Sequence, residues 1–547
     1  MEKKIRDKKS YEIVWEVLPW IFMVCGMIVT SVLVATKGTR MLSSDFAAEY
    51  TLVRHLNEEH TIVSRTWCYS SWIKIFDAQI IRKMVFAIVG YDNWMKVRII
   101  SNLIMMVILS ASYIYTAAAA GFKKFGVWTA AVLSWPFGVW YLLDVLFSGG
   151  YFIYLINYIL TIGLLIKLSS PEDHDKGKAR LIIRIAALGF LGFTSGLDGL
   201  RGLMVCYTPL VIGSVLLTVI SDATGFEEKD RVKNFRFAGF SVFVFACSGF
   251  GYLINKFILP RWFIFSSNYG NNPKWIELDP GKILATYSDF LQLLGYRSGV
   301  HIMSLMGVLN FLAIILAAMY VISLIRLCVR FKELSFANRI ITVYNITFGV
   351  FLAVIYMVSD WAYNESYWVP LLPFVFIAIQ AEYDTDPLLR RDSLFGTKCI
   401  SAMFIISVIG VSLSTYLSPY TWAINNSDDR INGVSRWVAE SGYESGYATF
   451  WNSAILEELS AGKVRMYSIN NVTENARPYY WLQVSEVPVD ETAGRSFVLI
   501  GHDEFNNILS EAQKQYILDN YVYDDGIYIV VDITTLSDYL EIMTQLM

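Results

Sequence analysis

The sequence predicts a polytopic α-helical membrane protein that carries a small soluble α/β domain at its C-terminal end. Of its 547 residues, 55% are hydrophobic and 17% are charged, and the mean hydropathy is +0.44. Soluble domains carry about 25% charged residues, so a soluble protein this apolar could not cover its surface with polar groups. Composition therefore excludes a soluble multidomain enzyme and a disordered or fibrous chain.

About eleven apolar runs are long enough to cross a bilayer, which takes about 20 residues of helix. The first run follows a basic start without a small-residue cleavage site after it, so we expect a retained helix rather than a signal peptide. The runs are 14–36, 96–119, 127–146, 150–167, 181–197, 202–220, 237–258, 301–327, 339–359, 366–382 and 399–416.

Lysine and arginine gather in every second loop between these runs, which sets the expected orientation. With the basic loops inside, the N-terminus is cytoplasmic, and the tail and the segments 37–95 and 259–300 lie outside. The basic loops hold Lys123 and Lys124, then Lys176, Lys178 and Arg180, then Lys229, Arg231 and Lys233, then Arg330 and Lys332, and finally Arg390 and Arg391.

Two outer loops, 37–95 and 259–300, are long. Loops of this length usually have a functional role and do more than connect two helices. In the first loop, residues 46–60 predict a helix with an apolar stripe along the membrane surface. Ser43, Ser44 or Asp45 could cap it. Residues 72–89 mix apolar and charged side chains too densely to span, so we expect a second interfacial helix there.

The composition changes after residue 416, where long apolar runs stop and polar residues become frequent. We therefore expect a membrane domain over 1–416 and an extracytoplasmic soluble domain over 417–547. About 130 residues are enough for a separate core. The patterns predict helices at 448–459 and 504–520, strands at 463–469 and 496–501, and a hairpin at 521–533.

Several common chemistries have no motif here. The chain lacks GxxxxGK[ST], HExxH, paired CxxC and GxSxG patterns, and its 6 cysteines show no metal-binding spacing. A net charge of −3 offers no basic face for nucleic acid. The sequence therefore assigns no cofactor with certainty, and a divalent metal ion stays open.

The strongest positive signal is Asp45, a carboxylate shortly after the first span. At the outer membrane surface it could accept a proton from an incoming hydroxyl. Glu49 lies four residues on and shares its helix face. The plain alternatives are that Asp45 only caps its helix and that Glu49 is a solvated surface residue.

This arrangement resembles the membrane glycosyltransferases of the GT-C fold, including the protein O-mannosyltransferase and aminoarabinose transferase relatives. The likeness covers 11–416 and lies in the acid after the first span, the two interfacial helices, the number of spans and the outward soluble domain. It implies a polyprenyl- or dolichyl-phosphate sugar as donor and Asp45 as base toward the acceptor. Many relatives carry adjacent acids at this site, whereas Ser44 and Phe46 flank Asp45. A second carboxylate and a metal are therefore not assigned, and Glu49 is the nearest helper.

A lipid-phosphate donor needs cations at the outer surface. Arg201 follows a glycine-rich turn and could bind phosphate oxygens bidentately. The alternative is that Arg201 pairs with Asp198 across that turn. Arg261 and Arg297, in the second long outer loop, are further candidates.

Three other residues, Asp144, Asp198 and Tyr367, are candidates for the same cavity. Tyr367 lies where relatives often carry an Arg-Tyr…Pro motif, although Glu365 and Ser366 replace the basic residue here. Its alternative role is in an aromatic belt at the membrane interface. Asp144 ends the third span, and ionisable groups at membrane depth are costly and tend to be functional. It is expected to face the same cavity as Asp45.

The favoured function is inverting transfer of a sugar from a polyprenyl-phosphate donor to a surface glycan, lipid or protein. The alternatives are a transporter or flippase of lipid-linked glycans and a membrane anchor for an outside binding domain. A transporter predicts charged mid-span residues, duplicated halves and short outer loops. The sequence instead has few mid-span charges, no internal duplication and long outer loops. A surface-glycan function without sorting signals favours a bacterial plasma membrane.

Overall fold

The computed structural model describes residues 2–90, 92–122, 126–170, 177–224, 227–266, 274–359, 365–385, 394–418, 426–491 and 494–546. The basic residues Lys123, Lys124, Lys176, Arg390 and Arg391 lie outside this part. The chain divides into two compact units. The helical unit comprises Met1–Leu33, Asn102–Lys256 and Asn271–Pro419, and the α/β unit comprises Val34–Ser101, Phe257–Gly270 and Tyr420–Met547.

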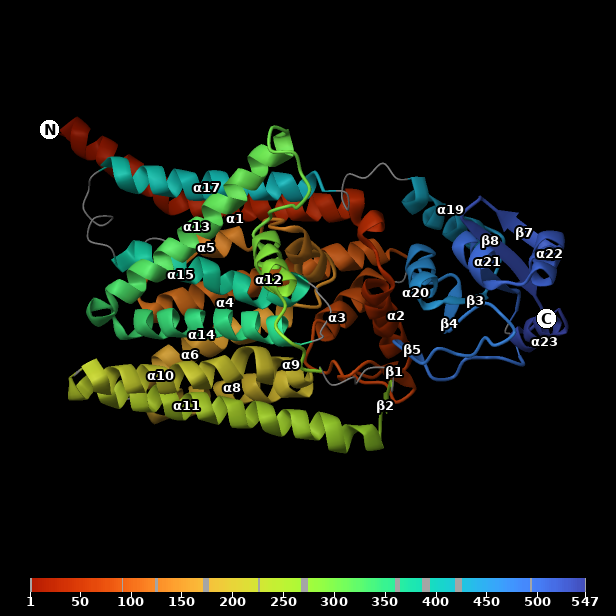
Figure 1. Cartoon of the computed structure of the whole chain (residues 1–547), viewed down its shortest axis with the longest axis horizontal. Helices are drawn as coiled ribbons and strands as arrows, with labels where there is room; N and C mark the ends of the chain where they lie inside the picture. The colour runs from red at the N-terminus through yellow and green to blue at the C-terminus, as the bar shows by residue number, and fades with distance from the viewer. Residues whose placement is uncertain are drawn as a thin grey trace. The chain divides into compact units, whose positions relative to one another are not determined.

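Each predicted apolar run overlaps a helix, and 8 helices in the described chain are long and apolar enough to cross a membrane. The long helices are drawn in Figure 1. Their bounds are α1 (Glu2–Met41), α4 (Trp94–Ala120), α6 (Phe152–Ser169), α8 (Lys178–Leu197), α10 (Thr208–Thr224), α11 (Glu228–Leu253), α13 (Leu305–Val329), α14 (Phe336–Val358), α15 (Leu372–Thr385) and α17 (Leu394–Tyr416).

Two predicted runs are interrupted. The run 127–146 forms α5 (Gly126–Val132) and a π-helix, η1 (Tyr141–Phe147). Pro136 and Gly138 lie between them, and Gly138 has φ +71°, so the helix stops where proline lacks an N–H and glycine turns the chain. The run 366–382 begins as a 3-10 helix, η6 (Glu365–Leu371), before α15.

Shorter elements complete the connections between the long helices. They are α9 (Leu200–Gly202) with the π-helix η2 (Leu203–Tyr207), the π-helix η3 (Ile254–Ile258) with the 3-10 turn η4 (Leu259–Arg261), α12 (Pro280–Leu293) and η5 (Phe331–Glu333).

Small residues bring α8 and α11 together, and the two helices run side by side in Figure 1. A Cβ added at Gly192 would lie 2.6 Å from the Val244 carbonyl oxygen, and one at Gly251 would lie 2.2 Å from the Phe193 carbonyl oxygen. Membrane helices use such glycines to pack backbone against backbone.

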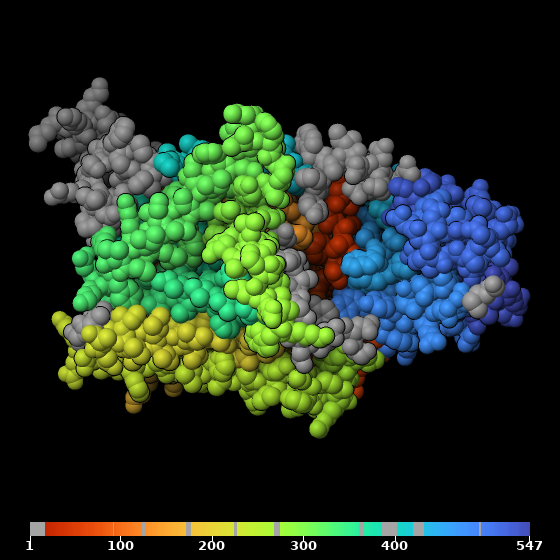
Figure 2. All heavy atoms as spheres, viewed as in Figure 1, coloured from red at the N-terminus to blue at the C-terminus, as the bar shows by residue number. Residues whose placement is uncertain are grey.

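The outer face of α11 carries large apolar side chains. Phe235 is 76% exposed and Phe250 is 60% exposed. The helix α11 belongs to the yellow to yellow-green part of the surface in Figure 2. A contiguous exposed apolar face on a long helix is typical of contact with lipid.

The segment 37–95 forms the two predicted helices, and between them a short strand that the sequence analysis does not predict, all in the α/β unit. These are α2 (Ser44–Glu58), β1 (Trp67–Tyr69) and α3 (Gln79–Val89). The second helix starts later than its predicted residue 72, because Lys74 adopts φ +54° and interrupts a helix. The strand β1 pairs in parallel with β2 (Ile264–Phe265) and antiparallel with β5 (Gln483–Val484).

The tail contains a five-stranded sheet in the order β4-β3-β6-β8-β7. The first three strands are parallel and the others pair antiparallel; in the centre, Tyr447 lies between Tyr467 and Val498. The elements are α19 (Asn426–Glu440), β3 (Ser445–Thr449), α20 (Phe450–Leu459), β4 (Arg465–Ile469), β6 (Ser496–Gly501), α21 (His502–Ile508), α22 (Glu511–Asn520), β7 (Tyr521–Asp524), β8 (Tyr528–Ile533) and α23 (Leu536–Gln545).

Helices cover both faces of this sheet because successive residues of a strand point to opposite sides. In β6, Val498 and Ile500 join one apolar core, whereas Phe497 and Leu499 join the other. The predicted helix 504–520 is two helices, since Ser510 caps α22 through the Gln513 backbone N–H.

Candidate active site

Asp45 lies in the first turn of α2 and does not cap it. The cap is Ser43, whose hydroxyl accepts from the Phe46 backbone N–H at 3.4 Å. The alternative that Asp45 is only the helix cap is therefore wrong. The residue as a whole is exposed, and the helix N-terminus favours a negative charge there.

Two side chains from distant parts of the sequence act on the Asp45 carboxylate. Trp481 from the tail forms a side-chain hydrogen bond with it, and the Lys74 ammonium lies close enough to act on its charge. Although the residue is exposed, the protein around its carboxyl group partly buries that group, and this burial raises its pKa. Lys74 and the Trp481 hydrogen bond both oppose that rise in pKa.

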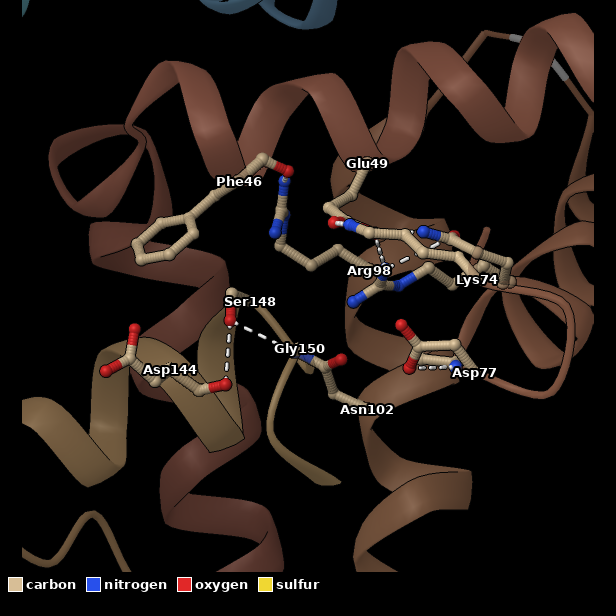
Figure 3. A network of polar contacts seen from close by, with 12 residues as sticks. Phe46, Glu49, Lys74, Asp77, Arg98, Asn102, Asp144, Ser148 and Gly150 are labelled. Carbon is tan, nitrogen blue, oxygen red and sulfur yellow. Dashed lines mark hydrogen bonds and ion pairs between the residues drawn. The ribbon is translucent and has the colours of Figure 1, made fainter. Parts of the chain in front are cut away.

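Glu49, one turn further along α2, is buried rather than solvated, so that alternative is also wrong. It forms ion pairs with Lys74 and with Arg82, at 2.9 Å from the Arg82 Nη1, and accepts a hydrogen bond from Gln79. Figure 3 shows Glu49 and Lys74 directed toward one another. Glu49 therefore anchors the lysine that acts on Asp45.

A second buried charge network supports this helix. The Arg98 Nη2 donates to both carboxylate oxygens of Glu458, at 2.7 and 2.6 Å, and to the Phe46 carbonyl oxygen at 3.3 Å. Its guanidinium stacks 4.0 Å from the Tyr50 ring centroid, and Arg82 lies 5.3 Å from the same centroid. These contacts join α2, α4 and the tail helix α20.

Sequence reasoning missed Lys74, Trp481, Arg82, Arg98 and Glu458. Arginine and lysine in an amphipathic stretch are normally solvated, so their types alone give no signal. Glu458 and Arg98 are 360 positions apart, and only folding brings them together. A tryptophan in a polar tail offers one weak signal, since its indole N–H requires an acceptor when buried.

The helical unit holds a second group of predicted residues around Arg201. The Arg201 Nη1 donates to the Tyr151 hydroxyl at 2.6 Å. Its guanidinium lies 5.2 Å from the Tyr151 ring centroid, 5.8 Å from that of Tyr154 and 4.9 Å from that of Tyr367. The structure therefore brings Arg201 and Tyr367 together. Gly199, at φ +96°, allows the turn that precedes Arg201.

Asp144 and Asp198 are both buried in the helical unit. Asp144 lies in η1. The Asn102 side-chain amide donates to the Leu146 and Phe147 carbonyl oxygens of this helix, at 2.7 and 2.8 Å. Figure 3 shows the Ser148 side chain bonded to the Asp144 backbone carbonyl oxygen. The charges of Asp144 and Arg201 both act on Tyr151. Asp45 belongs to the other unit, so a cavity shared with Asp144 stays a prediction.

The two remaining predicted cations differ in their surroundings. Arg261 is exposed at the end of η4. Arg297 donates from its guanidinium to the Ser414 and Leu417 carbonyl oxygens, and burial lowers its pKa. It therefore closes the C-terminal end of α17, where the helix dipole favours a cation. Among the described residues, no group of three or more His, Cys, Asp or Glu side chains could hold a metal ion.

Comparison with known proteins identifies the fold. No protein-family model matches the sequence, and no curated protein matches it. ArnT from Cupriavidus metallidurans bound to undecaprenyl phosphate superposes with a TM-score of 0.52 at 12% identity, over 96% of this chain and 99% of that one. The chain therefore has the GT-C fold, as its sequence predicts.

A more distant similarity is to the oligosaccharyltransferase AglB from Archaeoglobus fulgidus in complex with an inhibitory peptide and a dolichol-phosphate. Its TM-score is 0.46 at 11% identity, over 82% of this chain. The chain spans 64% of that protein.

Proposed function

We propose that the protein is a membrane glycosyltransferase that moves a sugar from a polyprenyl-phosphate donor to a hydroxyl of an extracytoplasmic acceptor. The observation that carries this proposal is Asp45, an exposed residue at a helix N-terminus, next to Glu49 and Arg82, whose charges are buried and paired. The shared fold with ArnT, whose structure contains undecaprenyl phosphate, supports the donor class.

In the proposed reaction, Asp45 takes the proton of the acceptor hydroxyl as general base. The acceptor oxygen attacks the anomeric carbon and forms the new glycosidic bond. The bond from that carbon to the phosphate oxygen breaks, and the polyprenyl phosphate leaves with the electron pair. A single displacement of this kind inverts the anomeric centre.

The donor phosphate requires a cation that stabilises the charge on the departing oxygen. We assign this role to Arg201, because guanidinium groups bind phosphate bidentately and the tyrosine rings around it stabilise its charge. Arg261, exposed in η4, is a further candidate. Arg297 already binds backbone carbonyls, which favours a structural role for it.

Glu49 was expected to assist as a second acid, and we revise that role. Its carboxylate is buried and occupied by Lys74, Arg82 and Gln79, so it acts through Lys74 and is a positioning residue. The acceptor class, a surface glycan, lipid or protein, and the outward orientation of the tail remain parts of the proposal.

An in vitro transfer assay with a panel of polyprenyl-phosphate sugars tests the function. We expect wild type to transfer sugar from at least one donor, and Asp45→Asn to lose about 100-fold or more of that rate, the usual size of general-base catalysis. Asp92→Asn is the matched control, because Asp92 is an exposed carboxylate in the same loop.

Two results would contradict the proposal. Undiminished transfer by Asp45→Asn would remove Asp45 as the base. No transfer from any donor, combined with scrambling of labelled lipid in liposomes that contain the protein, would instead identify a flippase.

A further inference from the structure

The tail segment 479–485 pairs with the segment 37–95 through backbone hydrogen bonds. Its strand β5 pairs antiparallel with β1, and the Ser485 backbone N–H donates to the Thr66 carbonyl oxygen at 2.6 Å. Inside the segment, the Gln483 side-chain amide donates to the Tyr479 carbonyl oxygen at 2.7 Å. Backbone pairing on one side and a buried amide on the other therefore hold the residues between them.

The residue after Trp481, Leu482, has an unfavourable backbone conformation that the surrounding packing must hold in place. Leu482 adopts φ +49°, a left-handed conformation that costs free energy for a residue with a branched side chain. Its side chain packs with Ala47, Ala48 and Ala454, where α2 meets α20. Packing against the helix that carries Asp45 therefore compensates for the unfavourable backbone.

Buried ion pairs also hold the helix α20 against α2 and α4. Glu458 is paired with Arg98, and Glu457 accepts from the Arg54 Nη1 at 3.3 Å. Both glutamate side chains are 2% exposed. The tail thus has three separate attachments near α2, through β5, Leu482 and α20, and Trp481 immediately precedes the first two in the sequence.

We propose that Trp481 is a positioning residue for Asp45, so that the C-terminal tail supplies part of the carboxylate site. This inference rests on the proposed function, in which Asp45 is the base. The indole N–H is a donor only, and an ionised carboxylate is an acceptor only. Their hydrogen bond therefore stabilises the proton-accepting form of Asp45, and it holds one oxygen while the other can face the acceptor hydroxyl.

The test compares Trp481→Phe with Trp451→Phe in the full-length protein. Phenylalanine keeps an aromatic ring but removes the N–H, and Trp451 is a tail tryptophan that is 66% exposed. We expect Trp481→Phe to lower kcat about tenfold, the size of one hydrogen bond to a charged group. We expect KM for the donor to stay near its wild-type value and Trp451→Phe to transfer at the wild-type rate.

A second readout is independent of catalysis. Carbodiimide modifies protonated carboxyl groups, so its labelling of Asp45, followed by peptide mass spectrometry against pH, reports the protonation of this side chain directly. We expect the labelling midpoint in Trp481→Phe to move up by about one pH unit, the shift that corresponds to one such hydrogen bond. Lys74, the charged group that acts on Asp45, is unchanged in this variant.

The two readouts separate the two proposals. An unchanged labelling midpoint in folded Trp481→Phe overturns the role of Trp481, whatever its activity. A shifted midpoint in a protein whose wild type transfers no sugar supports the hydrogen bond while the proposed function fails. A midpoint that shifts equally in Trp451→Phe means that any tail substitution disturbs the site, and it also overturns the inference.

Discussion

At the scale of single residues, opposing effects set the protonation of Asp45. Partial dehydration raises the pKa of its carboxyl above the ordinary 3.8, while the Lys74 charge and the Trp481 hydrogen bond lower it. A raised pKa makes a carboxylate a better proton acceptor once it is ionised. The two opposing groups keep it ionised over a wider range of pH.

The pH dependence of transfer follows from these directions. In the proposed reaction Asp45 is the base and works only when ionised, so we expect the rate to fall as pH falls through a midpoint above that of an ordinary aspartate. Lys74→Gln removes a charge that lowers the pKa of Asp45, so the midpoint should move to still higher pH. Arg82 and Gln79 still hold Glu49 in this variant.

The measurement is the profile of kcat against pH for wild type, Lys74→Gln and Lys96→Gln. Lys96 is an exposed lysine near the start of α4 and should leave the profile unchanged. If the midpoint of the kcat profile in Lys74→Gln is unchanged or moves to lower pH, then the Lys74 charge does not lower the pKa of Asp45.

At the scale of elements, the α/β unit depends on charges that are buried in pairs. The Arg98 side chain is 0% exposed and its partner Glu458 is 2% exposed. Removing one partner leaves the other charge buried without compensation, which is far more costly than losing a surface pair. The pair joins α4 to α20, and Arg98 also donates to the Phe46 carbonyl of α2. The pair therefore stabilises the packing of the tail helix α20 against α2.

We expect Glu458→Gln to lower the free energy of unfolding by about 3 kcal/mol, measured as a lower Tm in detergent. Lys514→Gln breaks a pair with the exposed Glu511 and should cost about 0.5 kcal/mol or less. The double variant Arg98→Met with Glu458→Leu should recover most of the stability, because no charge is then left buried. Equal Tm values for Glu458→Gln and Lys514→Gln would refute this account.

The contact of α8 with α11 gives a second prediction for elements. Gly192→Ala places a methyl group 2.6 Å from the Val244 carbonyl oxygen, so the helices must separate. We expect a loss of about 1–3 kcal/mol, the usual cost of overpacking, again as a lower Tm. Gly239→Ala in α11 meets nothing within 4 Å and serves as the control; a similar Tm for both variants would contradict close packing here.

At the scale of the whole molecule, orientation in the membrane is predicted from the basic loops. A membrane-impermeant maleimide should label Gln515→Cys, exposed in α22, on intact cells. It should label Lys178→Cys, exposed at the start of α8, only after permeabilisation. Both variants are made with the six native cysteines replaced. Labelling of Lys178→Cys on intact cells would reverse the assigned orientation.

The fold class and the position of Asp45 could be predicted from the sequence because both depend on local patterns. Apolar length indicates a membrane helix, and an acid beside a serine cap at a helix start needs only neighbouring residues to be recognised. Residues 445–449 were not predicted as a strand, since a short buried segment has no period of its own. The helix break at Ser510 likewise depends on a cap rather than on hydrophobicity.

The sequence by itself determined that this protein is polytopic, that the segment 37–95 forms two helices and that Asp45 lies at the start of one of them. Tertiary structure alone decided what surrounds that acid. Lys74 reaches Asp45 from a left-handed turn, and Trp481 reaches it from a tail more than 400 positions away. Such contacts arise from strand pairing, buried ion pairs and helix packing between distant segments, and no local pattern encodes them.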